Sequence, residues 1–384
     1  MICVDKNKVG ILKIIQRENN MKEFSTYKKD DVIFLLKDIS DMIVEEDNMT
    51  REKKIQSGTH YSEMIPIEYK VSDEYLNLYR TKLEENKEKL AFAIGVMSEK
   101  ILKRHDENVV LVSLARAGTP IGILAKRYIK QRYNLDLPHY TISIIRDRGI
   151  DINAIKYIIN KHTDSSKIQF IDGWTGKGTI ANELKKACDE LEGIFNMKFD
   201  SSLAVLADPC GYSNVYGIRE DFLIPSACLN STVSGLVSRT VLRDDLIIEK
   251  DDFHGAKFYK ELKDVDESNK YLDIISACFE NEYENIDKTM KNWTEDIITK
   301  VGNCDVKNIK QKYDIEDINF IKPGVGETTR VLLRRIPYKI LVDDLDNQKL
   351  KHILILAKEK NVEVEEFDFK AYSCCGIIKN MKDV

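Results

Sequence analysis

The sequence predicts an α/β protein built around a parallel sheet, and three observations support this prediction. From residue 108 onward, short runs rich in β-branched residues alternate with stretches of helical periodicity. These runs are apolar on both faces, as in strands that helices cover on both sides. The chain of 384 residues is also longer than a single hydrophobic core usually supports, so we expect more than one domain.

The central region, residues 106–263, is expected to form the sheet domain. Its strands are predicted at residues 109–114, 140–145, 168–171 and 203–206. Its helices are predicted at residues 119–133, 152–160 and 178–191. A helix therefore follows each of the first three strands, which is the alternation that parallel strand pairing requires.

The regions on either side of the sheet domain differ from it in pattern. Residues 1–105 are predicted as a helical segment that packs on the sheet domain, because apolar residues recur at helical spacing, as at Val32, Leu35, Leu36 and Ile39. A polar loop at residues 57–64 interrupts this pattern. Residues 264–312 are predicted as a charged helical connector. Residues 313–384 are predicted as a small α/β domain, with its elements at residues 339–342, 346–359 and 362–367.

The composition limits the classes of protein that the chain can belong to. Hydrophobic residues make up 43% of the chain, which excludes a wholly disordered protein. The net charge of −5 argues against a dedicated nucleic-acid binder, so any nucleic-acid site must be a local patch. No segment reaches the roughly 18 consecutive apolar residues that span a bilayer. We therefore expect no membrane association. The eight cysteines lack zinc-site spacing, so we expect reduced thiols in a cytoplasmic protein.

A glycine-rich turn after the strand at residues 168–171 has the composition of a phosphate-binding site. The strand leads into Asp172, and a helix is predicted to follow the turn. The residues of the turn that we expect to contact phosphate are Thr175, Gly176, Lys177, Gly178 and Thr179. Glycines let backbone N–H groups approach an anion, and the helix dipole favours negative charge there. The spacing matches neither the Walker A loop nor the GxGxxG fingerprint, and the alternative is an ordinary βα turn.

Three segments together resemble the type I phosphoribosyltransferases. The turn with Asp172 resembles the loop of that family that binds phosphoribosyl diphosphate. Its pyrophosphate loop is similar to Arg116, Ala117 and Gly118, and its mobile catalytic loop is similar to the segment with Arg146 and Arg148. All three segments occur in the family's order. Where the family has a second acid before the phosphate loop, this chain has Gly173.

The resemblance implies a role for each segment. Asp172 would hold the ribose hydroxyls and Mg²⁺, and residues 175–179 would hold the 5-phosphate. Residues 116–118 would bind the diphosphate, and Arg146 or Arg148 would cover the leaving group. Phosphoribosyl diphosphate would be the co-substrate, and the partner a nucleotide-like small molecule. For Arg146 and Arg148, a solvated loop is the alternative interpretation.

A more specific resemblance covers nearly the whole chain. Residues 57–68, 113–122, 172–179, 221–240 and 252–255 resemble the phosphoribosyltransferase-like proteins of bacterial tellurite-resistance and stress operons, a family also named StiP and labelled a cysteine protease. Residues 221–240 are dense in hydroxyl and amide side chains, so we expect them either to cover an acceptor or to form a Ser/Thr-rich packed helix.

The protease label requires a thiolate beside a histidine. Cys210, which follows the strand at residues 203–206, is the best-placed thiol, and His254 is the base that we assign to it; His60 and His139 are alternatives. An unreactive packed thiol is the other interpretation of Cys210. A thiol mechanism does not explain the phosphate-binding turn, so we expect proteolysis to be the alternative activity.

The start of the small C-terminal domain resembles the pelota-type RNA-binding domain. Residues 322–339 contain five basic residues and one acid. The glycine, glutamate, threonine and basic positions of the pelota family match Gly324, Glu327, Thr329 and Arg330, while Gly326 replaces the usual asparagine. The resemblance implies RNA binding by these residues together with Lys322 and Arg334. The alternative is a solvated basic helix start.

The expected function is therefore a cytoplasmic, Mg²⁺-dependent phosphoribosyltransferase-like enzyme with a C-terminal RNA-binding domain. It would transfer ribose 5-phosphate to a base or to an RNA-linked acceptor in a stress response. The alternatives are a cysteine protease that uses Cys210 and a non-catalytic protein that binds a ribose phosphate and RNA. The sequence leaves the oligomeric state open.

Overall fold

The computed structural model describes residues 24–68, 71–162, 167–247 and 249–380, so the expectations for residues 1–23, including Cys3, lie outside it. At its centre is a parallel sheet of six strands, in the order β1 (Ile33–Phe34), β6 (His139–Ile142), β5 (Val109–Leu114), β9 (Lys167–Trp174), β10 (Ala204–Ala207) and β11 (Tyr216–Ile218). The prediction of an α/β protein with a parallel sheet is confirmed.

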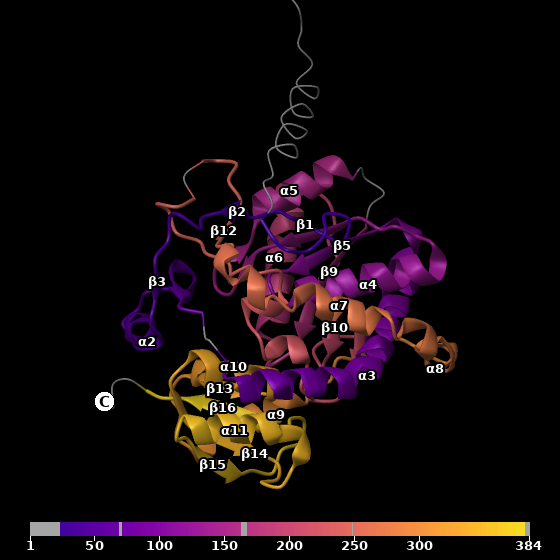
Figure 1. Cartoon of the computed structure of the whole chain (residues 1–384). Coiled ribbons are helices and arrows are strands. Elements are labelled where there is room, and N and C mark those ends of the chain that lie inside the picture. The colour runs from indigo at the N-terminus through magenta and orange to yellow at the C-terminus, as the bar shows by residue number, and fades with distance from the viewer. Residues whose placement is uncertain (1–23, 69–70, 163–166, 248, 381–384) are drawn as a thin grey trace, which may run out of the picture.

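Helices cover both faces of this sheet. Successive side chains of its strands are apolar and point to opposite faces, so each face packs into a separate hydrophobic core. Leu111 on β5 packs with the helices α3 (Asp73–His105) and α4 (Gly118–Tyr133), and its neighbours Val110 and Val112 pack with α5 (Ile152–Lys161) and α6 (Thr179–Phe195). Hydrophobic side chains on both faces explain why β5 is buried along its whole length. Figure 1 shows α5 and α6 on one side of the sheet and α3 and α4 on the other.

The strand order places a crevice at the carboxyl ends of β5 and β9. The chain runs from β5 to β6 on one side of β5, and later returns to β9 on its other side. Ligands of open α/β sheets bind in the crevice outside the strand ends, where the strand order reverses. The loops after β5 and β9 therefore flank the position at which a ligand is expected.

The helical prediction for the segment before α3 is wrong in part. Between residues 24 and 68, the structure has the short strands β1, β2 (Lys37–Asp38), β3 (Glu45–Glu46) and β4 (Ile65–Pro66). It also has one α-helix, α2 (Asn48–Gln56), and a 3-10 turn at Tyr61–Glu63. The backbone N–H of Leu35 donates to the Thr141 carbonyl at 2.9 Å, and that of Lys37 donates to the His254 carbonyl at 2.9 Å. These partners are distant in the sequence, so tertiary pairing overrides the local helical spacing.

The predicted connector is helical and packs against the sheet domain. It contains α7 (Ser268–Ser276), α8 (Phe279–Lys291) and α9 (Gly302–Lys312). Helices α7 and α8 both contact α3, and their buried side chains belong to the same core as Leu111. The domain boundaries drawn from the sequence stay predictions.

The C-terminal domain contains a mixed sheet with helices on both faces. Its strand order is β13 (Ile321–Pro323), β16 (Cys374–Ile378), β14 (Pro337–Val342) and β15 (Glu363–Glu366). Helices α10 (Val325–Arg334) and α11 (Lys351–Glu359) share a core with Ile340, while α9 shares one with Leu341. Figure 1 shows α10 between this sheet and the rest of the molecule.

Membrane insertion by a helix has no support in the described residues. None of the helices formed by these residues combines the length and the hydropathy that a membrane span requires.

Candidate functional site

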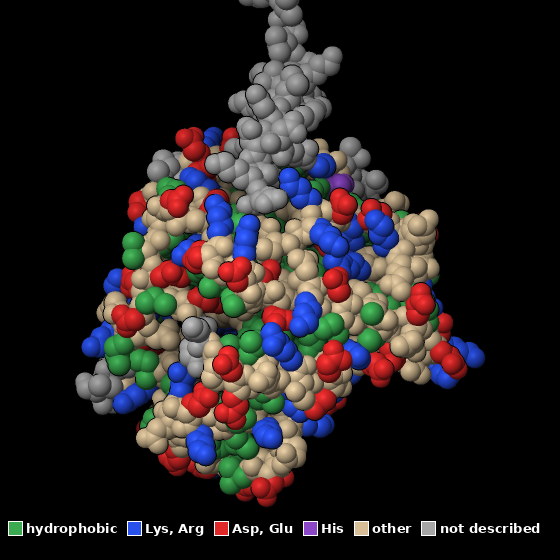
Figure 2. Space-filling view, viewed as in Figure 1, with side chains coloured by type: hydrophobic (Ala, Val, Ile, Leu, Met, Phe, Trp, Pro, Cys, Tyr) green, Lys and Arg blue, Asp and Glu red, His purple; other side chains and the backbone are tan. Residues whose placement is uncertain are grey.

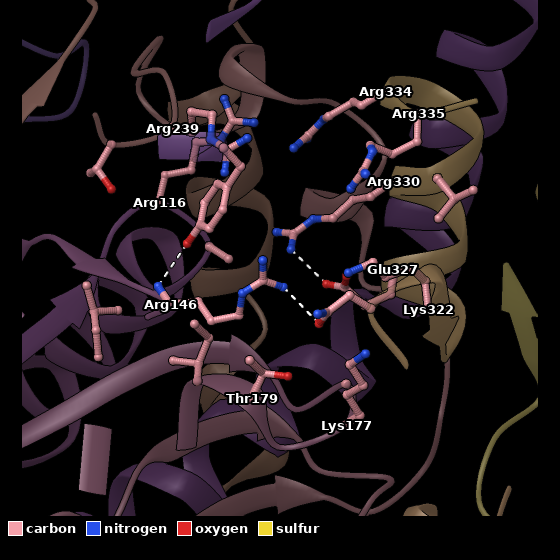
Figure 3. A pocket seen from close by; sticks show the side chains of 18 of the residues that line it. Arg116, Arg146, Lys177, Thr179, Arg239, Lys322, Glu327, Arg330, Arg334 and Arg335 are labelled. Atoms are coloured by element: carbon pink, nitrogen blue, oxygen red, sulfur yellow. Dashed lines mark hydrogen bonds and ion pairs between the residues drawn. The ribbon is translucent and has the colours of Figure 1, made fainter. Parts of the chain in front are cut away.

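A cavity of 570 Å³ lies where the carboxyl ends of β5 and β9 face the C-terminal domain. Its lining comes from α2, from the loops after β5 and β9, from the segment with Arg239, and from β13 and α10. Figure 3 shows side chains from the loops after β5 and β9, from the segment with Arg239, and from β13 and α10 pointing toward one another across the space. The cavity thus occupies the crevice that the strand order predicts, with the C-terminal domain as its opposite wall.

The two loops that the sequence singled out meet at the cavity. Gly118 begins α4 so close to β9 that a Cβ would collide with the Ile171 carbonyl, so only glycine fits there. Gly178 has φ +75°, and a Cβ there would overlap the Tyr212 ring. The carbonyl oxygen of Ala117 lies 3.3 Å from the position that a Cβ on Gly173 would occupy. The structure therefore brings the predicted phosphate turn and the loop with Arg116 together.

Within the turn, the side chains do not all point where the sequence analysis expected. The hydroxyl of Thr175 is buried and donates to the Asp208 carboxylate. The ammonium of Lys177 donates to the carbonyls of Ile318 (2.5 Å) and Ile321 (3.3 Å), both close to the C-terminal domain's first strand. Thr175 and Lys177 thus support the turn itself.

The backbone of the turn keeps its donors free. None of the N–H groups of residues 176–179 donates a hydrogen bond to another described residue. Gly178 is the N-cap of α6, so all four of these groups precede or begin the helix. Unpaired N–H groups at a helix N-terminus attract anions.

The walls of the cavity carry an excess of positive charge. Among the described residues, nine Lys and Arg side chains and four carboxylates line it. Five of the cationic residues precede the C-terminal domain, namely Arg51, Arg116, Arg146, Lys177 and Arg239. Four belong to that domain, namely Lys322, Arg330, Arg334 and Arg335. Figure 2 shows Lys and Arg interspersed with Asp and Glu on the outer face in view, so the excess inside the cavity contrasts with that mixed surface.

Several of these cations lack partners and are poorly solvated. Burial, together with the charge of the neighbouring Lys177, lowers the pKa of Lys322 to about 7. Burial also lowers the pKa of Lys177 to about 8 and that of Arg239 to about 9. The Nε atoms of Arg51, Arg239 and Arg334 are buried without a hydrogen-bond partner among the described residues. A bound anion would compensate these charges.

Arg116 is held in place by the segment that was expected to cover an acceptor. Its guanidinium donates to the Asn230 side-chain oxygen at 2.7 Å and to the Val237 carbonyl at 3.1 Å. The packed-helix alternative for residues 221–240 is wrong, because this segment forms two short 3-10 turns, Pro225–Ala227 and Ser231–Val233.

The two arginines of the predicted catalytic loop point in different directions. Arg146 lines the cavity, lies 5.1 Å from the Tyr61 ring centre and donates to the Asn319 side chain at 3.0 Å. Arg148 lies outside the lining and pairs with Glu63. Only Arg146 is therefore placed to meet a ligand in this cavity.

Helix α10 turns its basic side toward the phosphate turn. Of the predicted RNA-binding residues, Lys322, Glu327, Arg330 and Arg334 line the cavity. Gly324 and Thr329 do not, and Thr329 is fully buried with its hydroxyl donating to the Val325 carbonyl at 2.7 Å. The basic patch predicted from the sequence is thus an inner wall.

Trp174 explains why glycine replaces asparagine in α10. Arg330 stacks on the Trp174 ring at 4.3 Å from its centre. A Cβ on Gly326 would lie 2.5 Å from the same indole. The turn after β9 and α10 therefore pack too closely for any side chain at position 326.

Buried carboxylates fix the C-terminal domain to the rest of the protein. Asp221 accepts hydrogen bonds from the backbone N–H groups of Val325 (2.9 Å) and Ser373 (2.8 Å), and burial raises its pKa to about 6. Glu52 holds Arg335 with two hydrogen bonds of 2.7 and 2.9 Å. Arg51 and Glu52 were missed from the sequence because they belong to no local motif, and Asp221 and Arg239 had no role assigned to them within residues 221–240.

Asp172, the predicted sugar and metal ligand, is a buried acid at the cavity. Its carboxylate accepts from the Gly173 N–H at 2.7 Å, and burial raises its pKa to about 6. Within the described residues, no group of three or more His, Cys, Asp or Glu is arranged to hold a metal ion.

Cys210 and His254 have separate hydrogen-bond partners. The Cys210 thiol is fully buried, lies 3.0 Å from the Thr175 hydroxyl, and has its pKa raised to about 12 by burial and by Asp208. The His254 ring bonds to the Ser143 hydroxyl at 2.9 Å. The structure does not bring the predicted thiol and base into contact.

Comparison with known proteins assigns most of the chain. Residues 25–276 match the family described as tellurite-like stress resistance cysteine protease StiP, and residues 300–380 match the PELOTA RNA binding domain. The chain is 35% identical over 348 residues to the cysteine protease StiP of Acinetobacter baylyi, a match that covers 87% of this chain and 88% of that protein. The chain belongs to the StiP family.

These matches confirm the StiP and pelota resemblances and overturn the expected activity. A family described as a cysteine protease, and a relative of that name, do not support a phosphoribosyltransferase. The predictions of phosphoribosyl diphosphate as co-substrate and of Mg²⁺ as cofactor were therefore wrong. The geometry adds a physical reason against Mg²⁺, because Asp172 belongs to no group of three or more potential metal ligands among the described residues.

Proposed function

We propose that this StiP-family protein binds RNA in the cavity between its StiP-matched region and its PELOTA domain. The observation that carries this proposal is the excess of poorly partnered cations, which come from both matched regions. Basic side chains contact RNA mainly through its phosphates. The phosphates of an RNA strand in the cavity would be negatively charged partners for Arg239, Lys322 and Arg334.

The orientation of α10 supports this location. The basic side chains of α10 face the cavity, so RNA that reaches Arg334 also comes within range of Arg116. Burial is the main cause that lowers the pKa of Arg334, and the charge of Arg116 is the next. A PELOTA surface turned to the solvent would instead leave Arg116 and Arg239 without a role. Both matched regions would therefore contribute to one RNA site.

The proposal is tested by binding of fluorescently labelled RNA to the full chain and to an Arg334→Glu variant. Arg334 makes no hydrogen bond to a described residue, and its Nε is buried without a partner, so reversing its charge breaks no hydrogen bond. We expect at least a tenfold loss of affinity and a weaker dependence on salt. The matched control is Lys186→Glu on the exposed side of α6, which should bind as the wild type does. Equal binding by the two variants would contradict the proposal.

A second candidate function is cysteine peptidase activity, which the 35% identity to the cysteine protease StiP favours. Cys210 is the thiol that we propose for it, with His254 as base, and this pairing requires His254 to leave the Ser143 hydroxyl and approach the thiol. A peptidase thiol must be reachable and deprotonated. Because Cys210 is buried with a raised pKa, activity would require α9 and Tyr372, which pack on it, to move away.

The peptidase candidate is tested with a denatured protein substrate and the variants Cys210→Ser and Cys304→Ser. Cys304 is exposed, so its variant controls for nonspecific loss of a thiol. Loss of hydrolysis with Cys210→Ser alone would support the assignment. Hydrolysis that survives Cys210→Ser would remove this residue as nucleophile. The cytoplasmic location and the likeness of the sheet to type I phosphoribosyltransferases stay predictions.

A further inference from the structure

The cavity limits the form of RNA that can enter it, and this inference rests on the proposed function. Its volume of 570 Å³ is in the range of sites for small molecules. One or two nucleotides fill such a space. A duplex is far larger, so only an unpaired strand can reach the side chains that line it.

The floor of the cavity limits how far a strand can extend. Leu114, Ala115 and Asp172, at the carboxyl ends of β5 and β9, form part of the lining. The two strands pair with each other, so the sheet is continuous at this point. An RNA strand that reaches the phosphate turn therefore ends there.

The end of such a strand meets a group of donors. The backbone N–H groups of residues 176–179 are unpaired among the described residues. In Figure 3, Thr179 and Lys177 lie at the bottom of the view, and Lys322 lies above them beside Glu327, on the wall that the C-terminal domain forms. The ammonium of Lys322 makes no hydrogen bond to a described residue, and Lys177 is the charged neighbour that lowers its pKa most. These donors and charges fit a phosphate monoester, which carries about two negative charges at neutral pH.

A second group of cations lies further from the turn. Figure 3 shows Arg116 and Arg239 on one side of the cavity, facing Arg334 and Arg330 on the other. Arg51, only 3% exposed, also lines the cavity, and its Nε has no partner among the described residues. Two groups of cations fit two successive phosphates of one strand.

We propose that the cavity takes the end of a single RNA strand, with its terminal phosphate at the turn 175–179 and the next phosphodiester between Arg239 and Arg334. The bases would stack on the aromatic and guanidinium surfaces of the lining, such as Tyr61 and the pair of Trp174 and Arg330. The protein would thus recognise unpaired RNA ends that carry a phosphate.

The test compares short RNAs of one sequence, about six nucleotides long, by fluorescence anisotropy with the full chain. The RNAs carry a 5′-phosphate, a 3′-phosphate or hydroxyls at both ends, and a blunt duplex of the same sequence is the fourth. We expect one phosphorylated strand to bind about tenfold or more tightly than the hydroxyl-ended strand, and the duplex to bind weakest. The stronger of the two phosphorylated strands identifies the end that enters.

Three results would overturn the inference. Equal binding of phosphorylated and hydroxyl-ended strands removes the terminal phosphate site. Duplex binding as tight as single-strand binding removes the size limit, and either result leaves the proposed RNA function intact. Failure of all four RNAs to bind overturns both proposals.

A pair of variants tests the location of the end without depending on the absolute affinity. In Lys322→Met, we expect the phosphorylated strand to bind at most about twofold more tightly than the hydroxyl-ended strand, because the free ammonium nearest to the terminal phosphate is gone. In Arg334→Met, we expect all strands to weaken while the preference remains. A preference that is unchanged in Lys322→Met would contradict the placement at the turn.

Discussion

Proton uptake on RNA binding is a direct consequence of the poorly solvated lysines in the cavity. Burial and Lys177 lower the pKa of Lys322 to about 7, and its other charged neighbours are Glu327, Arg335 and Arg146. The arginines add to the decrease, and Glu327 opposes it. A phosphate beside Lys322 favours its charged form and raises the pKa toward the ordinary value of about 10.4. RNA therefore binds best to the protonated protein.

The sign and size of the effect follow from these pKa values. Below pH 7, Lys322 is protonated before RNA binds, and the affinity is independent of this group. Above pH 7, each pH unit costs about 1.4 kcal/mol, or about tenfold in affinity, because binding must first add a proton. Above pH 8 the decrease steepens, since Lys177 with a pKa of about 8 also loses its proton.

The assay is the affinity for a single-stranded RNA between pH 6 and pH 9 at constant ionic strength. We expect a plateau up to about pH 7 and about a tenfold loss from pH 7 to pH 8. The variant Lys322→Arg keeps its charge throughout this range, so its affinity should be flat up to about pH 8. A wild-type affinity that does not change with pH, or a Lys322→Arg variant with the wild-type profile, would refute the reasoning.

Three further predictions concern the junction of the two regions and the thiols. Gly326→Asn should destabilise the protein by about 1–3 kcal/mol in chemical denaturation, because the new side chain overlaps Trp174. The control Gly193→Asn has open space around it and should not destabilise the protein. Equal denaturation midpoints for the two variants would show that α10 is not held against the turn. Glu52→Ala should lower the free energy of unfolding by about 3–5 kcal/mol, because it leaves Arg335 unpaired beside Arg51. Glu46→Ala, which removes the surface pair with Lys54, should lower it by at most about 1 kcal/mol. Similar losses in the two variants would mean that the Glu52 pair is exposed in solution. Iodoacetamide should label Cys304 and leave Cys210 unlabelled in the native protein, as judged by mass spectrometry, and rapid labelling of Cys210 would reveal an open state of the kind that peptidase activity requires.

The sequence predicts four of the six strands of the central sheet, β5, β6, β9 and β10, because each of these carries a local signal. Runs apolar on both faces mark strands such as β5 and β9, and the helices between them have regular spacing. The short strands β1 and β2 carry no such signal. Their pairing depends on Thr141 and His254, which follow far later in the chain, so the local spacing of Leu35 and Ile39 predicted a helix.

The candidate site was predicted in part, and the missing part lies in tertiary contacts. The turn after β9 and the basic start of α10 each carry a local pattern. That the two face each other depends on Asp221 and Glu52, which bind the C-terminal domain through contacts that span 104 and 283 residues of sequence. Arg239 and Arg51 contribute charge only through this arrangement. Gly326 was the one local sign of it, since its lack of a side chain permits the approach to Trp174.

The salt dependence of RNA binding by Arg239→Met is the most direct test of a shared cavity. Arg239 lies in the StiP-matched region, outside the PELOTA domain, and has no hydrogen-bond partner for its Nε among the described residues. If RNA lies in the cavity, the slope of log affinity against log salt should fall in magnitude by about 0.7, the value for one phosphate contact on a single strand. Arg243→Met, which removes a surface pair with Asp245, should keep the wild-type slope. An unchanged slope in Arg239→Met would place the RNA elsewhere and contradict the account.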